Sequence, residues 1–443
     1  MSLALIGLLT IVVMLALIMT KKLSTLIALI LVPIVGYFAA KGLNLITVED
    51  VKLGSLITTG LKNIAPTGVM FIFAILFFGI LTDAGTFDPI IDKTLKIVGN
   101  DPVKICVGTV ILASLVHLDG SGAVTFLITI PAMLPLYESL GMKKTVLATC
   151  TALGAGTMNM LPWGGPTLRA ISALESSTQD IFIPMIPSLV AGLIFIILVA
   201  IYLGKKEKAR LARENVQSKE VVTDAEKAVK AEEEALKRPK LFAVNIILIL
   251  AAVVTMVTNT LPPAVVFMIA TAITMILNYP DPAMQRKVID KHAPSALMMV
   301  SMLFAAGSFT GIVKGSGMLD AMAAALVNLV PASLGTKLPL ITGIFSMPLS
   351  FVFDPDSYYF GVLPVISTAA GSFGVAPEMV ARASIIGQMT TGFPVSPLTG
   401  ATFLLTGLAG IDLAEHQKST VPYAFMTTIV MLIVGIVFGA IAL

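Results

Sequence analysis

The chain is poor in the residues on which most enzymes and secreted domains depend. Only 12% of its 443 residues are charged, and it has two cysteines and three histidines. Soluble domains carry about 25% charged residues, so this charge content excludes an ordinary soluble domain. Cys106 and Cys150 are too few for a disulfide framework or a zinc site. Both lie in apolar segments and are interpreted as packing residues.

Enzyme and nucleic-acid signatures are also lacking. Gly120-Ser121-Gly122 does not have the Gly-x-Ser-x-Gly spacing of a nucleophile elbow, and no phosphate loop or paired zinc-ligand motif occurs. Three histidines are too few for a typical histidine-based metal enzyme. The net charge of +3 comes without a basic patch interleaved with aromatic residues, which argues against nucleic acid as a partner.

What the chain has is apolar sequence. Its residues are 56% hydrophobic and its mean hydropathy is +0.95, so it is predicted to be an all-α polytopic membrane protein. A membrane-spanning helix needs roughly 20 apolar residues. The first segment has no basic region before it and no cleavage pattern, so it is interpreted as a retained span. The uninterrupted spans are expected at 2–20, 24–40, 63–82, 183–204, 241–260, 263–279, 295–314 and 420–442, with interfacial amphipathic helices at 86–98 and 318–330.

Two further apolar segments in each half are interrupted by Gly, Pro and polar residues. In the first half they are a hairpin at 103–138 and a broken span at 143–175. In the second half they are a hairpin at 337–374 and a broken span at 378–410. Non-helical backbone survives at membrane depth only where it lines a protein-buried or water-filled cavity. Broken helices in corresponding positions of two halves point to the substrate site of a transporter.

The charged linker at 205–240 divides the chain into residues 1–204 and 241–443. If the linker is cytoplasmic, seven Lys and Arg residues before it, its own eleven and four after it lie inside, which is 22 of 29. This satisfies the positive-inside rule and places both termini outside a plasma membrane. Five crossings in each half, one of them broken, then make two inverted repeats, each with one re-entrant hairpin: ten spans and two hairpins in all.

The interruptions carry the candidate substrate-binding residues. Half-helix N-termini present unpaired N–H groups and partial positive charge, which suit anions. Any single hydroxyl could instead bond its own helix carbonyl, and Arg169 could bind a substrate carboxylate or an internal acid. The expected binding residues are Ser121, Gly122, Thr125, Asn159, Pro162, Gly164, Gly165, Thr167, Arg169, Ser357, Tyr358, Ser396, Pro397 and Thr399.

Four titratable residues near the interruptions are candidates for metal or proton coupling. Asp119, Asp354 and Asp356 could bind a proton or a divalent cation, or could simply cap a helix N-terminus. His117 could take part in proton coupling, because imidazole has an unperturbed pKa near 6.5. A packed histidine explains His117 equally well.

At these residues the chain resembles the citrate–divalent metal/proton symporter family of the ion transporter superfamily. The resemblance rests on LDGSGAVTFLITIPAMLPLY at 118–137, NMLPWGGPTLRA at 159–170 and DSYYFGVLP at 356–364. It implies two inverted repeats, alternating access and a homodimer. In sodium-coupled dicarboxylate relatives the hairpin tip carries Ser-Asn-Thr, whereas here the tips contain Asp119 and Asp354. This departure favours a cation held by carboxylates or by the substrate itself.

Charge arithmetic favours the same substrate. Moving a trivalent anion into an inside-negative cell costs about 2.3 kcal/mol per charge per 100 mV, roughly 7 kcal/mol for citrate. A half-helix dipole contributes only about 0.3–2 kcal/mol. The hypothesis is therefore import of citrate complexed with Mg²⁺, Ca²⁺ or a similar divalent cation, together with protons, with no permanently bound cofactor. The alternatives are a Na⁺-coupled di- or tricarboxylate transporter and an intramembrane enzyme using Asp119 and Asp356 as an acid pair.

Overall fold

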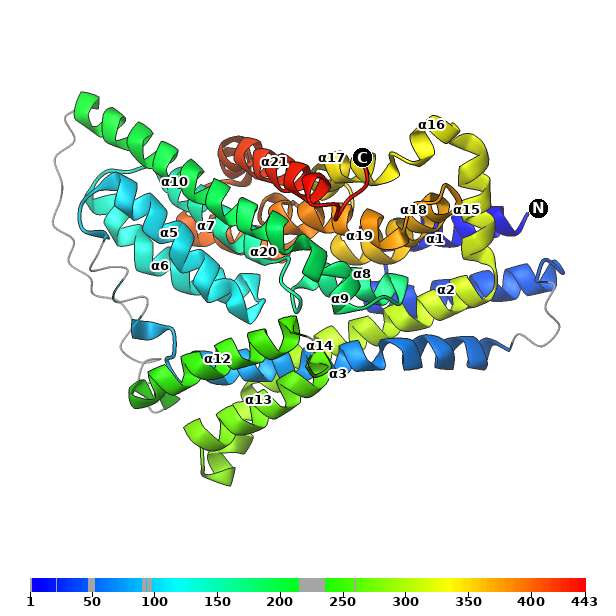
Figure 1. Cartoon of the computed structure of the whole chain (residues 1–443), viewed down its shortest axis with the longest axis horizontal. Helices are drawn as coiled ribbons and strands as arrows, with labels where there is room; N and C mark the ends of the chain where they lie inside the picture. Colours follow the sequence, from blue (N-terminus) through cyan, green and yellow to red (C-terminus); the bar gives the residue numbers. More distant parts are fainter. Residues whose placement is uncertain are drawn as a thin grey trace.

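The computed structural model describes residues 2–20, 22–46, 52–89, 93, 98–214, 236–258 and 260–443. All regular structure in these ranges is helical (Figure 1). Seven helical segments there are long and apolar enough to cross a membrane, so the chain is a multi-pass membrane protein, as its composition predicts. The elements are α1 (Leu3–Met19), α2 (Thr25–Gly42), α3 (Leu53–Asp83), α5 (Pro102–Val116), η1 (His117–Asp119), α6 (Gly122–Ser139), α7 (Lys144–Met158), α8 (Gly165–Leu174), α9 (Thr178–Ile181), η2 (Ile183–Met185), α10 (Ile186–Glu214), η3 (Pro239–Leu241), α12 (Phe242–Val257), α13 (Pro263–Asn278), α14 (Pro282–Gly315), α15 (Met318–Leu329), α16 (Ala332–Gly335), α17 (Leu338–Leu349), η4 (Ser357–Val362), α18 (Leu363–Ser372), α19 (Pro377–Ile386), η5 (Gly387–Thr391), η6 (Phe393–Val395), α20 (Gly400–Ala409) and α21 (Leu413–Val437).

One group of helices is built on close contact between α3 and α14, which run side by side with α12 and α13 next to them (Figure 1). A Cβ atom added to Gly60 would lie 2.0 Å from the carbonyl oxygen of Gly307, and one added to Gly311 would lie 2.4 Å from that of Leu56. Small residues permit such backbone approach between membrane helices. We call α1–α3 and α12–α15 the scaffold.

The interrupted helices form a second group, here called the broken-helix unit: α5–α8 and α17–α20 with the short elements between them. It lies on the upper side of α3 and α14 in Figure 1, where α10 and α21 pack against it. Each half of the chain has the same series of elements after its long scaffold helix, α3 or α14. The series consists of two helices joined by a break, a helix–break–helix segment, and a long helix. Contacts of α7 with η5 and η6 bring the two halves together at their breaks.

Two scaffold helices begin earlier than the hydropathy pattern predicts. The span expected at 63–82 is a helix from Leu53, and the one expected at 295–314 begins at Pro282. Both helices run through an internal proline without ending, which neighbouring helices make tolerable at membrane depth. Their added turns contain polar residues, so a hydropathy window stops short of the true helix start.

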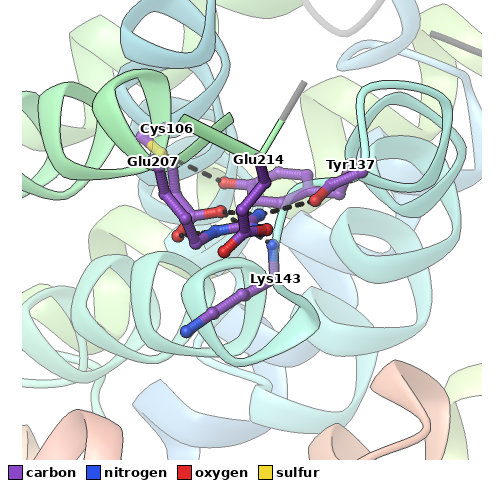
Figure 2. A network of polar contacts seen from close by, with 7 residues as sticks. Cys106, Tyr137, Lys143, Glu207 and Glu214 are labelled. Carbon is purple, nitrogen blue, oxygen red and sulfur yellow. Dashed lines mark hydrogen bonds and ion pairs between the residues drawn. The ribbon is translucent and has the colours of Figure 1, made fainter. Parts of the chain in front are cut away.

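The linker boundary is also shifted, because α10 continues from the span expected at 183–204 to Glu214. Glu207 in this extension is buried and accepts the backbone N–H of Lys143 at 3.0 Å. Arg210 donates to the Gly141 carbonyl at 2.6 Å and pairs with Glu207 at 2.8 Å. Figure 2 shows Glu207 beside Lys143, with Tyr137 close by. These bonds hold residues 205–214 against the α6–α7 turn, so that part of the linker is packed helix.

The remaining expected segments correspond closely to helices. The expected hairpins match α5–α6 and α17–α18, and the interfacial helix expected at 318–330 matches α15. Most of the interfacial helix expected at 86–98 lies outside the described residues. Because α6 alone has 18 residues and suits a full crossing by length, re-entry of the first hairpin stays a prediction.

Candidate functional site

A cavity of about 860 Å³ lies between the broken-helix unit and the scaffold. All four helix breaks reach it, and the scaffold supplies a mostly apolar opposite wall. Its lining from the broken-helix unit includes Gly120, Ser121, Gly122, Asn159, Trp163, Gly165, Arg169, Asp354, Asp356, Met389, Phe393 and Thr399. Its lining from the scaffold includes Ile18, Thr25, Phe71, Ile75, Gly79, Thr82 and His292.

Asn159 joins the first-half breaks to the second half. Its side-chain amide nitrogen donates to the Met389 carbonyl at 2.6 Å, and its Oδ1 lies 3.3 Å from Nε2 of buried His117. Met389 is in the left-handed region, with φ +57°, so it cannot continue a helical hydrogen-bond ladder. The amide of Asn159 therefore replaces a bond that the break removes.

Two further backbone carbonyls of the first-half breaks also accept hydrogen bonds from side chains. The indole Nε1–H of Trp163 donates to the Leu118 carbonyl at 2.8 Å, and the Thr167 hydroxyl donates to the Met160 carbonyl at 2.7 Å. Gly164 permits the tight turn after Asn159, because a Cβ there would lie 2.0 Å from the Asn159 carbonyl oxygen.

The second-half breaks are held in the same way. Ser350 Oγ donates to Gln388 Oε1 at 2.8 Å and accepts the Met389 N–H at 3.2 Å. The Ser396 hydroxyl donates to the Ser350 carbonyl at 2.5 Å, and Thr399 donates to the Phe393 carbonyl at 2.9 Å. The Ser396 and Thr399 hydroxyls are thus committed to backbone carbonyls, and that of Ser350 to a side-chain amide oxygen.

The charged part of the cavity wall is an ion pair between the two halves of the chain. Arg169 Nε donates to Asp356 Oδ1 at 2.7 Å, and both side chains are at most 14% exposed. Arg169 Nη1 also donates to the Gly165 carbonyl at 3.2 Å. Asp354 accepts the backbone N–H of Ser357 at 2.9 Å and its hydroxyl at 2.8 Å. Arg169 balances the charge of one of these two carboxylates, so this wall carries a net charge of one carboxylate.

Helix N-termini also converge on the cavity. The first residues of α6 (Gly122), α8 (Gly165) and α20 (Gly400) line it. Gly122 lies directly against Phe393, since a Cβ there would be 2.3 Å from the ring. N–H groups at helix starts carry partial positive charge, so this arrangement can bind anionic groups.

The structure separates the expected site residues into two sets. Those that line the cavity are Ser121, Gly122, Asn159, Gly165, Arg169, Asp354, Asp356, Pro397 and Thr399. Those that lie behind its wall are His117, Thr125, Pro162, Gly164, Thr167, Ser357, Tyr358 and Ser396. Several of the second set hold the breaks: Thr125 lies 2.8 Å from His117 Nδ1, and Tyr358 bonds Ser384 at 2.8 Å. The side chain of Asp119 lies outside the described residues.

Sequence analysis did not identify the polar residues of the scaffold wall. His292 lines the cavity, and its Nε2 lies 2.9 Å from Asp83 Oδ2. In the sequence His292 precedes an expected span and Asp83 follows another, so both were interpreted as loop residues. An acid directly after an apolar helix was the one usable signal.

Two solved structures share the fold of this chain. The YdaH transporter of Alcanivorax borkumensis superposes with a TM-score of 0.60 at 15% identity, covering 88% of each chain. MtrF of Neisseria gonorrhoeae, described as representing a class of antimetabolite efflux pumps, superposes with a TM-score of 0.57 at 13% identity, covering 86% of this chain and 83% of its own. At these identities the likeness concerns the fold.

Sequence relatives then identify the family. A model described as "Citrate transporter" matches residues 2–387. Two Bacillus subtilis proteins are similar over 99–100% of both chains: one named "Citrate transporter" at 46% identity, and one named "Mg(2+)/citrate complex secondary transporter" at 42%. The chain belongs to the citrate transporter family. The predicted resemblance is thereby confirmed, and so is the prediction of a transporter instead of an enzyme.

The bridging role of Asn159 can be tested directly. Asn159→Leu leaves the Met389 carbonyl and the His117 imidazole buried without this partner, at a cost of about 1–3 kcal/mol. We expect a lower apparent melting temperature of the detergent-solubilised protein. Asn328→Leu, at an exposed position on α15, is the matched control. Equal melting temperatures for both variants would contradict a bridging role.

Proposed function

We propose that the protein is a secondary transporter that imports citrate as a complex with a divalent metal ion, coupled to protons. The observation that carries this proposal is the charge of the cavity wall. Among the described lining residues, Arg169 is opposed by two carboxylates, Asp354 and Asp356. Bare trivalent citrate would meet a net negative wall, whereas the metal of a complex would face those carboxylates.

The carboxylates suit a metal that arrives with its substrate. Mg²⁺ is commonly held by one or two protein carboxylates together with substrate oxygens and water. Within the described part of the chain, no cluster of three or more His, Cys, Asp or Glu side chains could hold a metal alone. We assign Asp354 and Asp356 to the metal, and Ser121, Asn159, Arg169 and the helix N-termini to the citrate carboxylates. The B. subtilis relative named for the Mg²⁺–citrate complex supports this assignment.

The proposal includes alternating access, and the place of the cavity along the scaffold supports it. On α3 the cavity extends from Phe71 to Thr82, and the residue after α3 contacts the end of the linker, where Arg238 N–H donates to the Ala84 carbonyl at 2.9 Å. This places the cavity on the linker side, which the charge distribution assigns to the cytoplasm with both termini outside. In this proposal the structure corresponds to an inward-facing state, and the ten spans, two hairpins, two inverted repeats and the homodimer stay predictions.

The opposite side carries a contact that we call the latch: Glu175, Lys314 and Asn63. Glu175 follows α8 with φ +52° and pairs with Lys314 at the end of α14. It also accepts the Asn63 amide N–H at 2.8 Å. Lys314 is 22 residues beyond His292 on α14, about 33 Å along the helix. The latch thus ties the broken-helix unit to the scaffold on the side of the cavity away from the linker.

Reconstituted protein tests the proposed function. Uptake of labelled citrate into proteoliposomes should require Mg²⁺, Ca²⁺ or a similar cation and should be stimulated by a proton gradient. Citrate flux that is indifferent to both metal and proton gradient would reject the proposed substrate and coupling. A sodium requirement would instead support the Na⁺-coupled alternative.

Arg169→Ala should abolish uptake while the protein is still made, because the citrate contact is lost. The single change also leaves Asp356 buried and unpaired, which costs about 3–5 kcal/mol. The double variant Arg169→Ala/Asp356→Ala removes that cost, so it should recover thermal stability but not uptake. Arg286→Ala, on the exposed face of α14, is the control. Uptake by the stable double variant at the rate of the control would remove Arg169 from the site.

Lys314→Met should shift the protein away from the inward-facing state, because the latch is formed in that state. A partly exposed ion pair contributes about 0.2–1 kcal/mol. The ratio of the two states should therefore change by up to about fivefold. The reporter is the rate at which Thr82→Cys reacts with an impermeant maleimide from the linker side, in a background with Cys106 and Cys150 replaced by Ala. Lys208→Met breaks the 3.1 Å ion pair with Asp101, which does not join the broken-helix unit to the scaffold. This variant should leave the rate unchanged. An equal rate in both variants would show that the latch does not control access.

A further inference from the structure

The scaffold wall of the cavity contains one titratable side chain in the described part of the chain, His292. Its ring lies against Gly79, where a Cβ atom would be 2.7 Å from Nδ1. Its Nε2 lies 2.9 Å from Asp83 Oδ2, and the side chain is 19% exposed. The imidazole is therefore oriented by one ring nitrogen while it remains within reach of the cavity.

Asp83 is fixed between two basic groups. Its side chain is 5% exposed; Oδ1 accepts the Lys291 ammonium at 2.6 Å and Oδ2 faces His292. The phenol of Tyr279, at the end of α13, also lies near Asp83 and donates to the Leu236 carbonyl at 2.9 Å. The charged residues that line the rest of the cavity are Arg169, Asp354 and Asp356.

The cavity offers few places for a proton that exchanges near neutral pH. Arginine stays protonated in proteins. Asp354 accepts two hydrogen bonds from Ser357, and Asp356 accepts one from Arg169. The other two histidines, His117 and His416, are fully buried and do not line the cavity. Imidazole is the side chain whose unperturbed proton equilibrium lies between pH 5 and 8.

We infer that His292 is the linker-side proton-exchange site of the transport cycle, with Asp83 as its positioning residue. This inference rests on the proposed function. In the neutral ring, Nε2–H donates to Asp83. Nδ1 takes up one proton from cavity water, which forms the imidazolium. In the reverse step the imidazolium returns this proton to cavity water. With a metal–citrate complex of net charge −1, the cavity carries −2 when His292 is neutral and −1 when it is protonated. Protonation thus favours the loaded cavity, and deprotonation favours release.

The test measures metal–citrate exchange in sealed vesicles while only the pH on the linker side is varied. The wild-type rate should change at least fivefold between pH 5.5 and 8. His292→Gln should retain exchange but vary less than twofold over this range. His416→Gln, whose parent side chain lies 2.8 Å from the Pro394 carbonyl, is the matched control and should keep the wild-type profile.

Asp83→Asn keeps the side-chain shape and provides a second readout if His292→Gln fails to fold. A carboxylate stabilises the neighbouring imidazolium, so its loss should move the midpoint of the profile to lower pH while the step remains. A wild-type profile in His292→Gln, or an unmoved midpoint in Asp83→Asn, would overturn the assignment. So would a wild-type rate independent of linker-side pH. Failure of the proposed function would appear separately, as wild-type protein that does not exchange metal–citrate at all.

Discussion

The structure depends on satisfying the backbone groups that four helix breaks expose at membrane depth. Each unpaired group there costs several kcal/mol, because hydrocarbon offers no hydrogen bonds. Trp163, Thr167, Asn159 and Ser350 supply the missing donors and acceptors. The breaks are therefore rigid parts of a packed protein. Their helix N-termini can face water without the loss of neighbouring structure.

This constraint divides the polar residues of the breaks by task. Hydroxyls such as Thr167 and Ser396 bind carbonyls behind the wall. Charged side chains and N-terminal glycines line the cavity itself. The ion pair of Arg169 with Asp356 joins α8 to the start of η4, so the two halves of the chain share one charged surface. On the scaffold side, glycine contacts between α3 and α14 give that surface a stable counterpart.

Sequence reasoning located the helices and the breaks because hydropathy and Gly–Pro interruptions are local properties of the chain. For the same reason it singled out Asn159, Arg169, Asp354 and Asp356, which line the cavity. It could not decide which hydroxyls face the cavity, since Thr125 and Thr399 have the same chemistry and differ only in their neighbours. It also placed His292 in a loop, because the polar first turns of α14 conceal the helix and the Asp83 partner is 209 residues away.

The central claim is that the four breaks surround one metal–citrate site. A cryo-electron microscopy map of the protein with Mg²⁺ and citrate tests it most directly. Density for the complex should lie in the cavity beside Arg169, with the metal toward Asp354 and Asp356. Density at any other place, or an empty cavity under conditions in which the protein binds citrate, would contradict it.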